Sequence, residues 1–282
     1  MPRRLFALIT AALTITLSLP IAPAQATPPA PAANYLAVGD SITAGVGVSV
    51  DRAYPSLLDA GSRHLRLAAD AAVSGATVAG VASQLLAYPA ADRPGITRIT
   101  LTVGANDVGW LAALSACLNL PADTACATQI ADPVHHLTLA NLVDAGLATL
   151  ATTLPRLLVQ IKALYPNAKI FVAGYYELFG SKRTACTVAP GYSINLVNKT
   201  WYNQISRQLN RTIKTSVAAA NHDLPGTPAK YVDVSGAFDG HGFCDSGRRW
   251  VIGPQDDLTA VAHPNVKGQR AYAGAFRAKG IS

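Results

Sequence analysis

Residues 35–47 of this 282-residue chain have the sequence YLAVGDSITAGVG, an apolar run of strand length that passes directly into a turn flanked by glycines. This order predicts a strand that ends before Gly39 and places Ser41 at the carboxyl end of that strand, at the start of a helix. Considered alone, a serine in that place is more often a helix N-cap than a nucleophile. Its role therefore depends on which other residues reach the same edge of the sheet.

Apolar runs of strand length alternate with helical patterns along the rest of the chain. The pattern predicts strands at 35–38, 65–69, 99–103, 170–173 and 231–234. It predicts helices, the third of them divided in two near Pro155, at 54–61, 78–87, 133–164, 195–220 and 267–279. Such alternation indicates a single α/β domain in which helices cover both faces of a parallel sheet. In such folds the active site lies beyond the carboxyl ends of the strands.

The N-terminal 26 residues have the pattern of a cleaved secretory signal peptide. Two arginines precede an apolar run at 5–19, and the small residues of AQA at 24–26 form a cleavage site, with APA at 22–24 as the alternative. The run is shorter than the roughly 20 residues that span a bilayer, and we expect no later stretch to be long enough to cross one. The sequence thus predicts no stable membrane anchor, and divides into a leader at 1–26, a linker at 27–33 and one exported domain at 34–282.

The composition is that of a globular domain with few charges. Charged residues make up 14% of the chain, hydrophobic residues make up 50%, and the net charge is +7. These values exclude a disordered charged tail, a coiled coil and a collagen-like chain. The basic excess is mild and contains no Lys/Arg run, so we expect no nucleic-acid partner. We expect a monomer that acts on a small molecule or a lipid.

The chain has four cysteines, an even number beside a predicted export signal, so disulfides are expected. Three pairings are possible. The pairing of Cys117 with Cys126 is favoured because a short polar loop separates them, and this leaves Cys186 with Cys244. A metal site is disfavoured because no CxxC pair or close Cys/His group occurs.

Three further residues follow predicted strands or precede a predicted helix. Gly75 lies in SGAT after the second strand, Asn106 lies in GAND after the third, and His263 begins HPNVKG before the last helix. Each has an ordinary structural explanation by itself, such as an Asx turn for Asn106. Together with Ser41 they supply a hydroxyl, a general base and donors for an oxyanion. Acyl transfer needs that set of groups.

The stretches YLAVGDSITAGVG, SGAT, VGANDVGW and HPNVKGQRAYA, in that order, resemble the four motif blocks of the SGNH (GDSL) hydrolase family. The chain is especially similar to the secreted bacterial lipases and esterases of that family, over nearly all of its length after the leader. The resemblance implies a flavodoxin-like, three-layer α/β/α sandwich with a sheet of roughly five parallel strands. It also implies a serine hydrolase that needs no cofactor and no metal. The chain lacks the GxSxG motif of the α/β-hydrolase lipases.

Carried over to this chain, the resemblance implies that Ser41 is the nucleophile and His263 the general base. It assigns the oxyanion hole to the backbone N–H groups of Ser41 and Gly75 and to the side-chain amide of Asn106. The neighbouring aspartates are expected to brace the turns and not to act as catalytic acids; they are Asp40 and Asp107.

The sequence departs from the family pattern at one position. The family usually has an aspartate three residues before the histidine, and this chain has Ala260 there. We expect the backbone carbonyl of Ala260, or of a neighbour, to hold the Nδ1–H group of His263. Asp256 and Asp257 are close enough in sequence to be alternatives. The orienting group matters because it sets the tautomer of the imidazole, and its loss in a conventional triad lowers the rate by about 10⁴.

The resemblance implies an exported serine esterase or lipase that hydrolyses carboxylic esters, such as acylglycerols or other lipid-like esters, through an acyl-enzyme. The alternatives are a phospholipase A, a carbohydrate acetyl esterase, and a non-catalytic domain of the same fold that binds lipid or glycan. We expect His241 to be structural or to line the substrate cleft, and His135 and His136 to mark a helix start without a metal. The residues expected either to line an apolar acyl pocket or to close the core are Val78, Trp110, Leu111, Tyr175, Tyr176 and Phe179.

Overall fold

The computed structural model describes residues 34–281, so the leader expected at 1–26 and the linker expected at 27–33 lie outside the described residues. The described chain contains a five-stranded parallel sheet with the strand order β2-β1-β3-β6-β9. Its strands are β1 (Tyr35–Gly39), β2 (Leu67–Asp70), β3 (Arg98–Thr102), β6 (Lys169–Ala173) and β9 (Ala229–Val232). The predicted parallel sheet is confirmed, with strand ends that differ from the expected ones by at most two residues.

The strands align so that apolar residues form rows across the sheet. Leu36 pairs with Ile99, Ile99 pairs with Ile170, and Ile170 pairs with Ala229. All four are buried, because a parallel sheet covered on both faces has no solvent side. Since the strands run in one direction, the turns that follow β1, β3 and β6 meet at one edge of the sheet.

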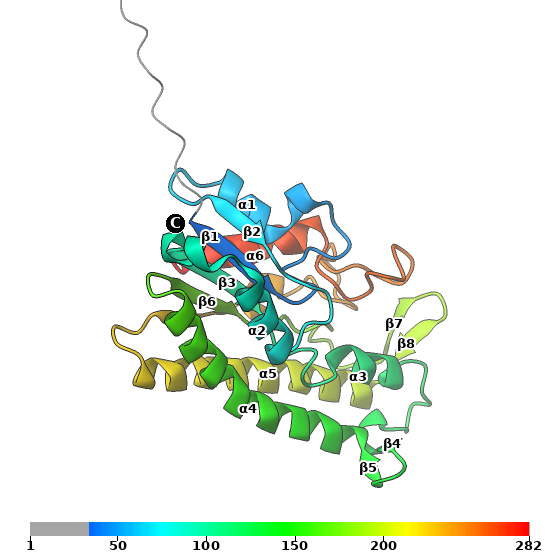
Figure 1. Ribbon diagram of the computed structural model, residues 1–282. Coiled ribbons are helices and arrows are strands. Elements are labelled where there is room, and N and C mark those ends of the chain that lie inside the picture. The colour runs from blue at the N-terminus through cyan, green and yellow to red at the C-terminus, as the bar shows by residue number, and fades with distance from the viewer. Residues whose placement is uncertain (1–33, 282) are drawn as a thin grey trace, which may run out of the picture. The chain divides into compact units, whose positions relative to one another are not determined.

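Helices lie on both faces of the sheet and complete three layers (Figure 1). On one face α1 (Tyr54–Ala60) packs against α6 (Val266–Ala278). On the other face α4 (Leu139–Leu164) packs against both α2 (Val78–Ala87) and α5 (Leu196–Asp223). A further helix, α3 (Trp110–Cys117), packs against α5. The α/β/α sandwich is therefore confirmed.

Helix α4 differs from the prediction of two helices over 133–164, because it is one helix of 26 residues that continues through Pro155. It begins only at Leu139, where Thr138 and Asn141 form a capping box. Pro155 removes the hydrogen bond to the carbonyl of Ala151, and since Ala151 is exposed, solvent can satisfy that carbonyl. By length and composition α4 could also span a membrane, contrary to expectation, but its apolar face packs against α2 and α5.

The pattern missed several short elements outside the sheet. Residues 34–281 contain two antiparallel hairpins and four 3-10 helices besides α3. The hairpins are β4 (Ile130–Asp132) with β5 (Leu137–Thr138) and β7 (Cys186–Ala189) with β8 (Tyr192–Ile194). The 3-10 helices span Val50–Arg52, Ala90–Gly95, Cys126–Thr128 and Ser235–Phe238. The expected helix start at residues 133–136 is instead the turn of the first hairpin, because the capping box delays the helix.

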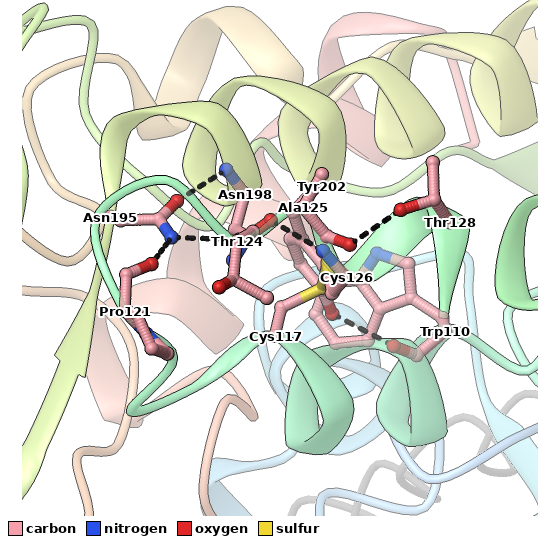
Figure 2. The surroundings of a disulfide bond; sticks show 10 residues. All are labelled: Trp110, Cys117, Pro121, Thr124, Ala125, Cys126, Thr128, Asn195, Asn198 and Tyr202. Carbon is pink, nitrogen blue, oxygen red and sulfur yellow. Dashed lines mark hydrogen bonds between the residues drawn. A yellow bond between two sulfur atoms is a disulfide. The ribbon is translucent and has the colours of Figure 1, made fainter. Parts of the chain in front are cut away.

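Two disulfides tie these outer segments together. The structure joins Cys117 to Cys126 and Cys186 to Cys244, the pairing that the short first loop favoured. Figure 2 shows the first disulfide beside the start of α5, where the side-chain oxygen of Asn198 accepts a hydrogen bond of 2.8 Å from the backbone N–H of Cys126. The loop that follows α3 is therefore held against α5.

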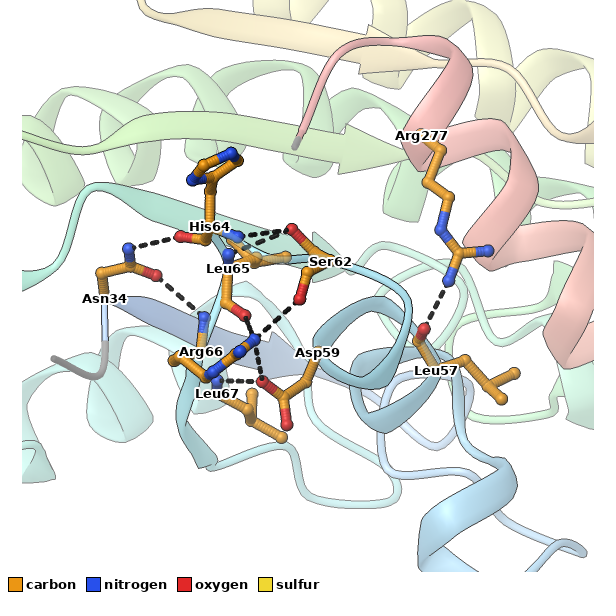
Figure 3. A network of polar contacts seen from close by, with 9 residues as sticks. All are labelled: Asn34, Leu57, Asp59, Ser62, His64, Leu65, Arg66, Leu67 and Arg277. Carbon is orange, nitrogen blue, oxygen red and sulfur yellow. Dashed lines mark hydrogen bonds and ion pairs between the residues drawn. The ribbon is translucent and has the colours of Figure 1, made fainter. Parts of the chain in front are cut away.

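A polar network lies at the amino ends of β1 and β2 (Figure 3), whereas Ser41 follows the carboxyl end of β1. The side chain of Asn34 donates to the carbonyl of His64 at 2.8 Å and accepts from the N–H of Arg66 at 3.1 Å. The Arg66 guanidinium donates to the carbonyl of Ser62 and lies 3.9 Å from the carboxylate of Asp59. These contacts hold the start of β2 beside β1.

Candidate active site

Ser41 lies in a tight turn at the end of β1. Gly39 has a φ of +137°, and a Cβ atom there would lie 2.5 Å from the carbonyl oxygen of Thr102, so only glycine fits. Residues 41–47 form turns, and the first α-helix begins at Tyr54, so the expected helix start at Ser41 is absent. The chain turns away from the sheet before it can form a helix. Ser41 is consequently not a helix N-cap.

Asp40 faces the protein interior beside Ser41. Its carboxylate accepts hydrogen bonds from the N–H of Ile42 at 3.0 Å, the hydroxyl of Thr102 at 2.6 Å and the hydroxyl of Tyr175 at 2.5 Å. Burial nevertheless raises the pKa of Asp40 to about 6, because these three bonds only partly compensate for the lost solvation. Asp40 is therefore placed to brace the turn, as expected, and within residues 34–281 its carboxylate makes no hydrogen bond to His263.

The side chains of Ser41 and His263 meet at the carboxyl edge of the sheet. The Nε2 atom of His263 lies 2.8 Å from the Oγ atom of Ser41. On the other side of the ring, Nδ1 lies 3.2 Å from the carbonyl oxygen of Ala260 and 3.1 Å from that of Val261. The imidazole of His263 therefore reaches the hydroxyl of Ser41 while two backbone carbonyls face the other side of the ring.

These contacts determine the tautomer of His263. Carbonyl oxygens only accept hydrogen bonds, so Nδ1 carries the proton and Nε2 is free to accept the proton of Ser41. Burial lowers the pKa of His263 below its ordinary value of 6.5, and the two carbonyls oppose this effect only in part. The imidazole is therefore neutral at pH 7, which is the form a general base requires.

Neither aspartate considered as the orienting group reaches His263. Asp256 accepts a hydrogen bond from the N–H of Gly253 at 2.9 Å, and Asp257 accepts from the backbone N–H and the hydroxyl of Thr259 at 2.8 and 2.7 Å. Both carboxylates shape the loop that precedes the histidine. The carbonyls of Ala260 and Val261 are thus the groups that face Nδ1.

The expected oxyanion donors Gly75 and Asn106 lie on the turns that follow β2 and β3, the two strands that flank β1 in the sheet. Gly75 has a φ of +82°, and a Cβ atom there would have no neighbour within 4 Å, so this glycine faces open space. The side-chain amide of Asn106 donates one hydrogen bond of 2.9 Å to the carbonyl of Ala76. An amide nitrogen carries two hydrogens, so one remains for a substrate oxygen. The carboxylate of Asp107 accepts from the N–H of Val78 and ties the two turns together.

Three cavities border these residues. The first, of about 640 Å³, includes Gly75 in its wall and extends along α2. The remaining two include His263 and Asn106 in their walls. One of about 250 Å³ includes His263 in its wall and is otherwise mainly apolar; it is lined by Leu111, Leu114, Ser115, Leu118, Tyr192, Pro254, Leu258, Thr259 and Val261. The other, of about 520 Å³, includes Asn106 and Val78 in its wall and extends along α2 and α4. The imidazole of His263 therefore has a mainly apolar space beside it.

The structure separates the six residues expected to line a pocket or close the core. Leu111, which is 48% exposed, lines the cavity beside His263, and Val78 lines the one beside Asn106. The four aromatic residues close the core instead; they are Trp110, Tyr175, Tyr176 and Phe179. Sequence reasoning missed Leu258 and Val261, although their closeness to His263 in sequence was a usable signal. Tyr192 carried no such signal, because only the β7–β8 hairpin brings it to the cavity.

The other singled-out polar residues make structural contacts. The ring of His241 stacks on Trp250 with centroids 3.8 Å apart, and its Nδ1 faces the carbonyl of Arg248. His135 pairs with the carboxylate of Asp132 at 2.7 Å. Within residues 34–281 no three His, Cys, Asp or Glu side chains are grouped as metal ligands.

Residues 37–271 match the GDSL-like Lipase/Acylhydrolase family. Curated relatives are similar over most of their length. Lipase 2 of Streptomyces coelicolor is 28% identical and the match covers 89% of this chain and 86% of that protein. Lipase 1 of the same organism is 30% identical, with 88% of this chain and 87% of that protein covered.

Solved structures share the fold. The crystal structure of the extracellular lipase from Streptomyces rimosus superposes with a TM-score of 0.66 at 22% identity, over 88% of this chain and 99% of that one. The phospholipase A1 from Streptomyces albidoflavus superposes with a TM-score of 0.64 at 22% identity, over 88% and 99%. Together with the family match, these findings show that the chain belongs to the GDSL-like lipase/acylhydrolase family and is a carboxylic ester hydrolase.

Proposed function

We propose that this chain is an exported lipase or esterase that cleaves lipid-like carboxylic esters with a Ser41–His263 dyad. The observation that carries the proposal is the 2.8 Å contact between Nε2 and Oγ, with Nδ1 held by carbonyl oxygens. In this mechanism His263 takes the hydroxyl proton as Ser41 attacks the ester carbonyl. The imidazolium then gives that proton to the departing alcohol. Water, deprotonated by the same histidine, releases the acid from the acyl-enzyme.

The carbonyls of Ala260 and Val261 replace the usual aspartate in this proposal. Both accept from Nδ1–H, so they fix the tautomer and the ring orientation without a negative charge. Their partial negative charges also favour the imidazolium that forms during the attack. Orientation is therefore retained, while a full ionic partner for the imidazolium is absent from its immediate contacts.

The oxyanion would be bound by neutral donors only. We assign these to the backbone N–H groups of Ser41 and Gly75 and to the second amide hydrogen of Asn106. The open surroundings of Gly75 leave space for a carbonyl oxygen. The bond from Asn106 to Ala76 holds the amide next to Gly75. Fixed donors of this kind stabilise the charge without reorganising during the reaction, and a single donor is typically worth about 10²–10³ in rate.

The acyl chain would occupy the cavity of about 250 Å³ beside His263. Its leucine and valine walls suit hydrocarbon and offer few partners to a sugar, which favours lipid-like esters over acetylated carbohydrates. The volume is below the roughly 300–1,000 Å³ of pockets that enclose a drug-sized ligand. We therefore propose a preference for short and medium acyl chains over long ones.

Export and a single catalytic domain complete the proposal. The signal-peptide pattern at 1–26 and the two disulfides support secretion, because disulfides persist in oxidising compartments. The family match over residues 37–271 supports a single hydrolase domain at 34–282.

The test is hydrolysis of p-nitrophenyl esters by the wild type and by Ser41→Ala, with fluorophosphonate labelling in parallel. We expect Ser41→Ala to lose both the activity and the label. Ser62→Ala, a serine at the amino edge of the sheet, is the matched control and should retain both. Unchanged hydrolysis by Ser41→Ala would contradict the dyad.

A further inference from the structure

Strand β6 lies between β3 and β9 in the sheet, and after Gly174 the chain continues with two tyrosines. Tyr175 and Tyr176 are only 2% and 1% exposed. Consecutive residues of an extended chain project in opposite directions. Their hydroxyl groups accordingly contact different parts of the site.

The hydroxyl of Tyr175 joins the two turns that carry the nucleophile and an oxyanion donor. It donates to the carboxylate of Asp40 at 2.5 Å and accepts from the N–H of Ala105 at 3.3 Å. Asp40 directly precedes Ser41, and Ala105 directly precedes Asn106. A single buried hydroxyl therefore links these two turns, in addition to the contacts between Asp40 and Thr102.

The hydroxyl of Tyr176 holds the loop of the general base. It donates to the carbonyl oxygen of Ala262. Ala262 stands between Val261, whose carbonyl faces Nδ1, and His263 itself. Its φ of +63° is uncommon for alanine, so this backbone conformation depends on its surroundings.

Both helical layers hold the backbone of these tyrosines. From α5, the amide of Asn210 accepts from the N–H of Tyr175 at 2.7 Å and donates to its carbonyl at 2.6 Å. From α6, the hydroxyl of Tyr272 donates to the carbonyl of Gly174 at 3.1 Å. A Cβ atom on Gly174 would lie 2.5 Å from the Asn210 oxygen, which keeps the two chains in close contact. The backbone at Gly174 and Tyr175 is therefore held by hydrogen bonds from both helical layers.

We propose that Tyr175 and Tyr176 are positioning residues that set the nucleophile, an oxyanion donor and the general base relative to one another. Tyr175 holds the side of the site that carries Ser41 and Asn106, and Tyr176 holds the side that carries His263. The inference rests on the proposed Ser–His function. It adds that two residues following β6, which belong to none of the four motif blocks, affect kcat.

The test compares Tyr175→Phe and Tyr176→Phe with Tyr165→Phe. Tyr165 is also fully buried and donates one hydrogen bond, of 2.7 Å to the carbonyl of Leu85, but it precedes β6 and lies at the opposite edge. All three variants lose a buried hydroxyl, so a purely structural effect would be similar in each. Fluorophosphonate titration to completion counts the competent sites, and kcat is expressed per titrated site, so partial misfolding does not affect the comparison.

We expect kcat to fall about 10- to 100-fold in Tyr175→Phe and in Tyr176→Phe, because sub-ångström misplacement of reacting groups has effects of this size. KM should stay within about twofold in both, since neither hydroxyl lines a cavity described above, and Tyr165→Phe should retain the wild-type kcat. A kcat within about twofold of wild type in either variant, or an equal loss in Tyr165→Phe, would overturn the proposal. If Ser41→Ala instead stays active, the Ser–His function itself fails, so the two failures are distinguishable.

Discussion

The imidazole of His263 lies between the hydroxyl of Ser41 on one side and two backbone carbonyls on the other, with Nε2 2.8 Å from Oγ. The two residues are 222 positions apart in sequence. Ser41 follows the first strand and His263 precedes the last helix, so the parallel sheet brings them together at one edge. Among the described residues no carboxylate hydrogen-bonds to Nδ1, and this has direct consequences for mutation and for pH.

Removing the nearby carboxylates should not affect turnover. Asp256→Asn and Asp257→Asn are expected to change kcat by less than about twofold, because neither carboxylate hydrogen-bonds to His263 and an amide oxygen still accepts the loop hydrogen bonds. His263→Ala, measured beside them, should lower kcat by several orders of magnitude. Steady-state kinetics on p-nitrophenyl butyrate provide the comparison. A large loss in either aspartate variant would show that a carboxylate orients the imidazole.

Asn106→Ala should lower kcat by about 10²–10³, or roughly 3–4 kcal/mol of transition-state stabilisation, with little change in KM. Asn106 donates to Ala76 at 2.9 Å, and its second hydrogen is the one assigned to the oxyanion. Asn167→Ala is the matched control, since Asn167 also donates to a backbone carbonyl, that of Pro94, but lies far from this edge. Equal kcat values in the two variants would show that Asn106 is not an oxyanion donor.

The acid limb of the pH–rate profile should lie below pH 6.5. Burial lowers the pKa of His263, so the neutral base persists to lower pH than a free imidazole would. The rate is lost only as pH falls through this lowered pKa. Measurement of kcat/KM from pH 4.5 to 8 locates the limb, because kcat/KM reports the free enzyme. A limb at or above pH 6.5 would contradict this account.

The unfolding free energy of Asp40→Asn, relative to that of the wild type, should be higher at pH 8 than at pH 4. Burial raises the pKa of Asp40 from 3.8 to about 6, so the folded state binds this proton more tightly than the unfolded chain. The stability that this bound proton contributes to the wild type is fully present below pH 3.8 and is lost as pH rises through about 6. The difference in unfolding free energy between variant and wild type should thus shift in favour of the variant from pH 4 to pH 8, by at most about 3 kcal/mol. Urea unfolding at both pH values measures it, and a pH-independent difference would contradict the burial effect.

Leu111→Trp should restrict the acyl chains that the enzyme accepts. Leu111 is 48% exposed and lines the cavity beside His263, so a larger side chain there reduces the space for hydrocarbon. We expect kcat/KM to fall about tenfold or more for octanoyl and longer esters and to stay near wild type for acetyl esters. Leu142→Trp, at an exposed leucine of α4, is the control and should leave the series unchanged. An equal loss for all chain lengths would place the acyl chain elsewhere.

The sheet could be predicted because its strands are consecutive runs of apolar residues, as a sheet covered on both faces requires. The amphipathic helices could be predicted for a similar reason, since one face of each is apolar. The predicted ends of the helices were less accurate. The capping box at Thr138 makes α4 begin later than its apolar pattern does, and packing keeps α4 helical through Pro155. The short hairpins were missed because tertiary contacts and disulfides stabilise them.

The candidate site also combines features that the sequence predicts with features that depend on tertiary contacts. Ser41, Gly75, Asn106 and His263 could be singled out from sequence because each directly follows a strand or precedes a helix, and parallel strands bring such turns to one edge. The roles of the buried tyrosines could not. An aromatic residue after a strand has the same sequence signature whether it lines a pocket, fills the core or holds a loop through its hydroxyl.

The order of strands, helices and motif blocks was thus determined by the sequence alone, because periodicity and turn chemistry are local properties. Which carbonyl groups face Nδ1 of His263 was decided only by the tertiary structure. Sequence revealed an alanine where an aspartate is usual, but a backbone carbonyl is present in every residue. Only the folded loop, with Ala262 at positive φ and held by Tyr176, turns the carbonyls of Ala260 and Val261 toward Nδ1.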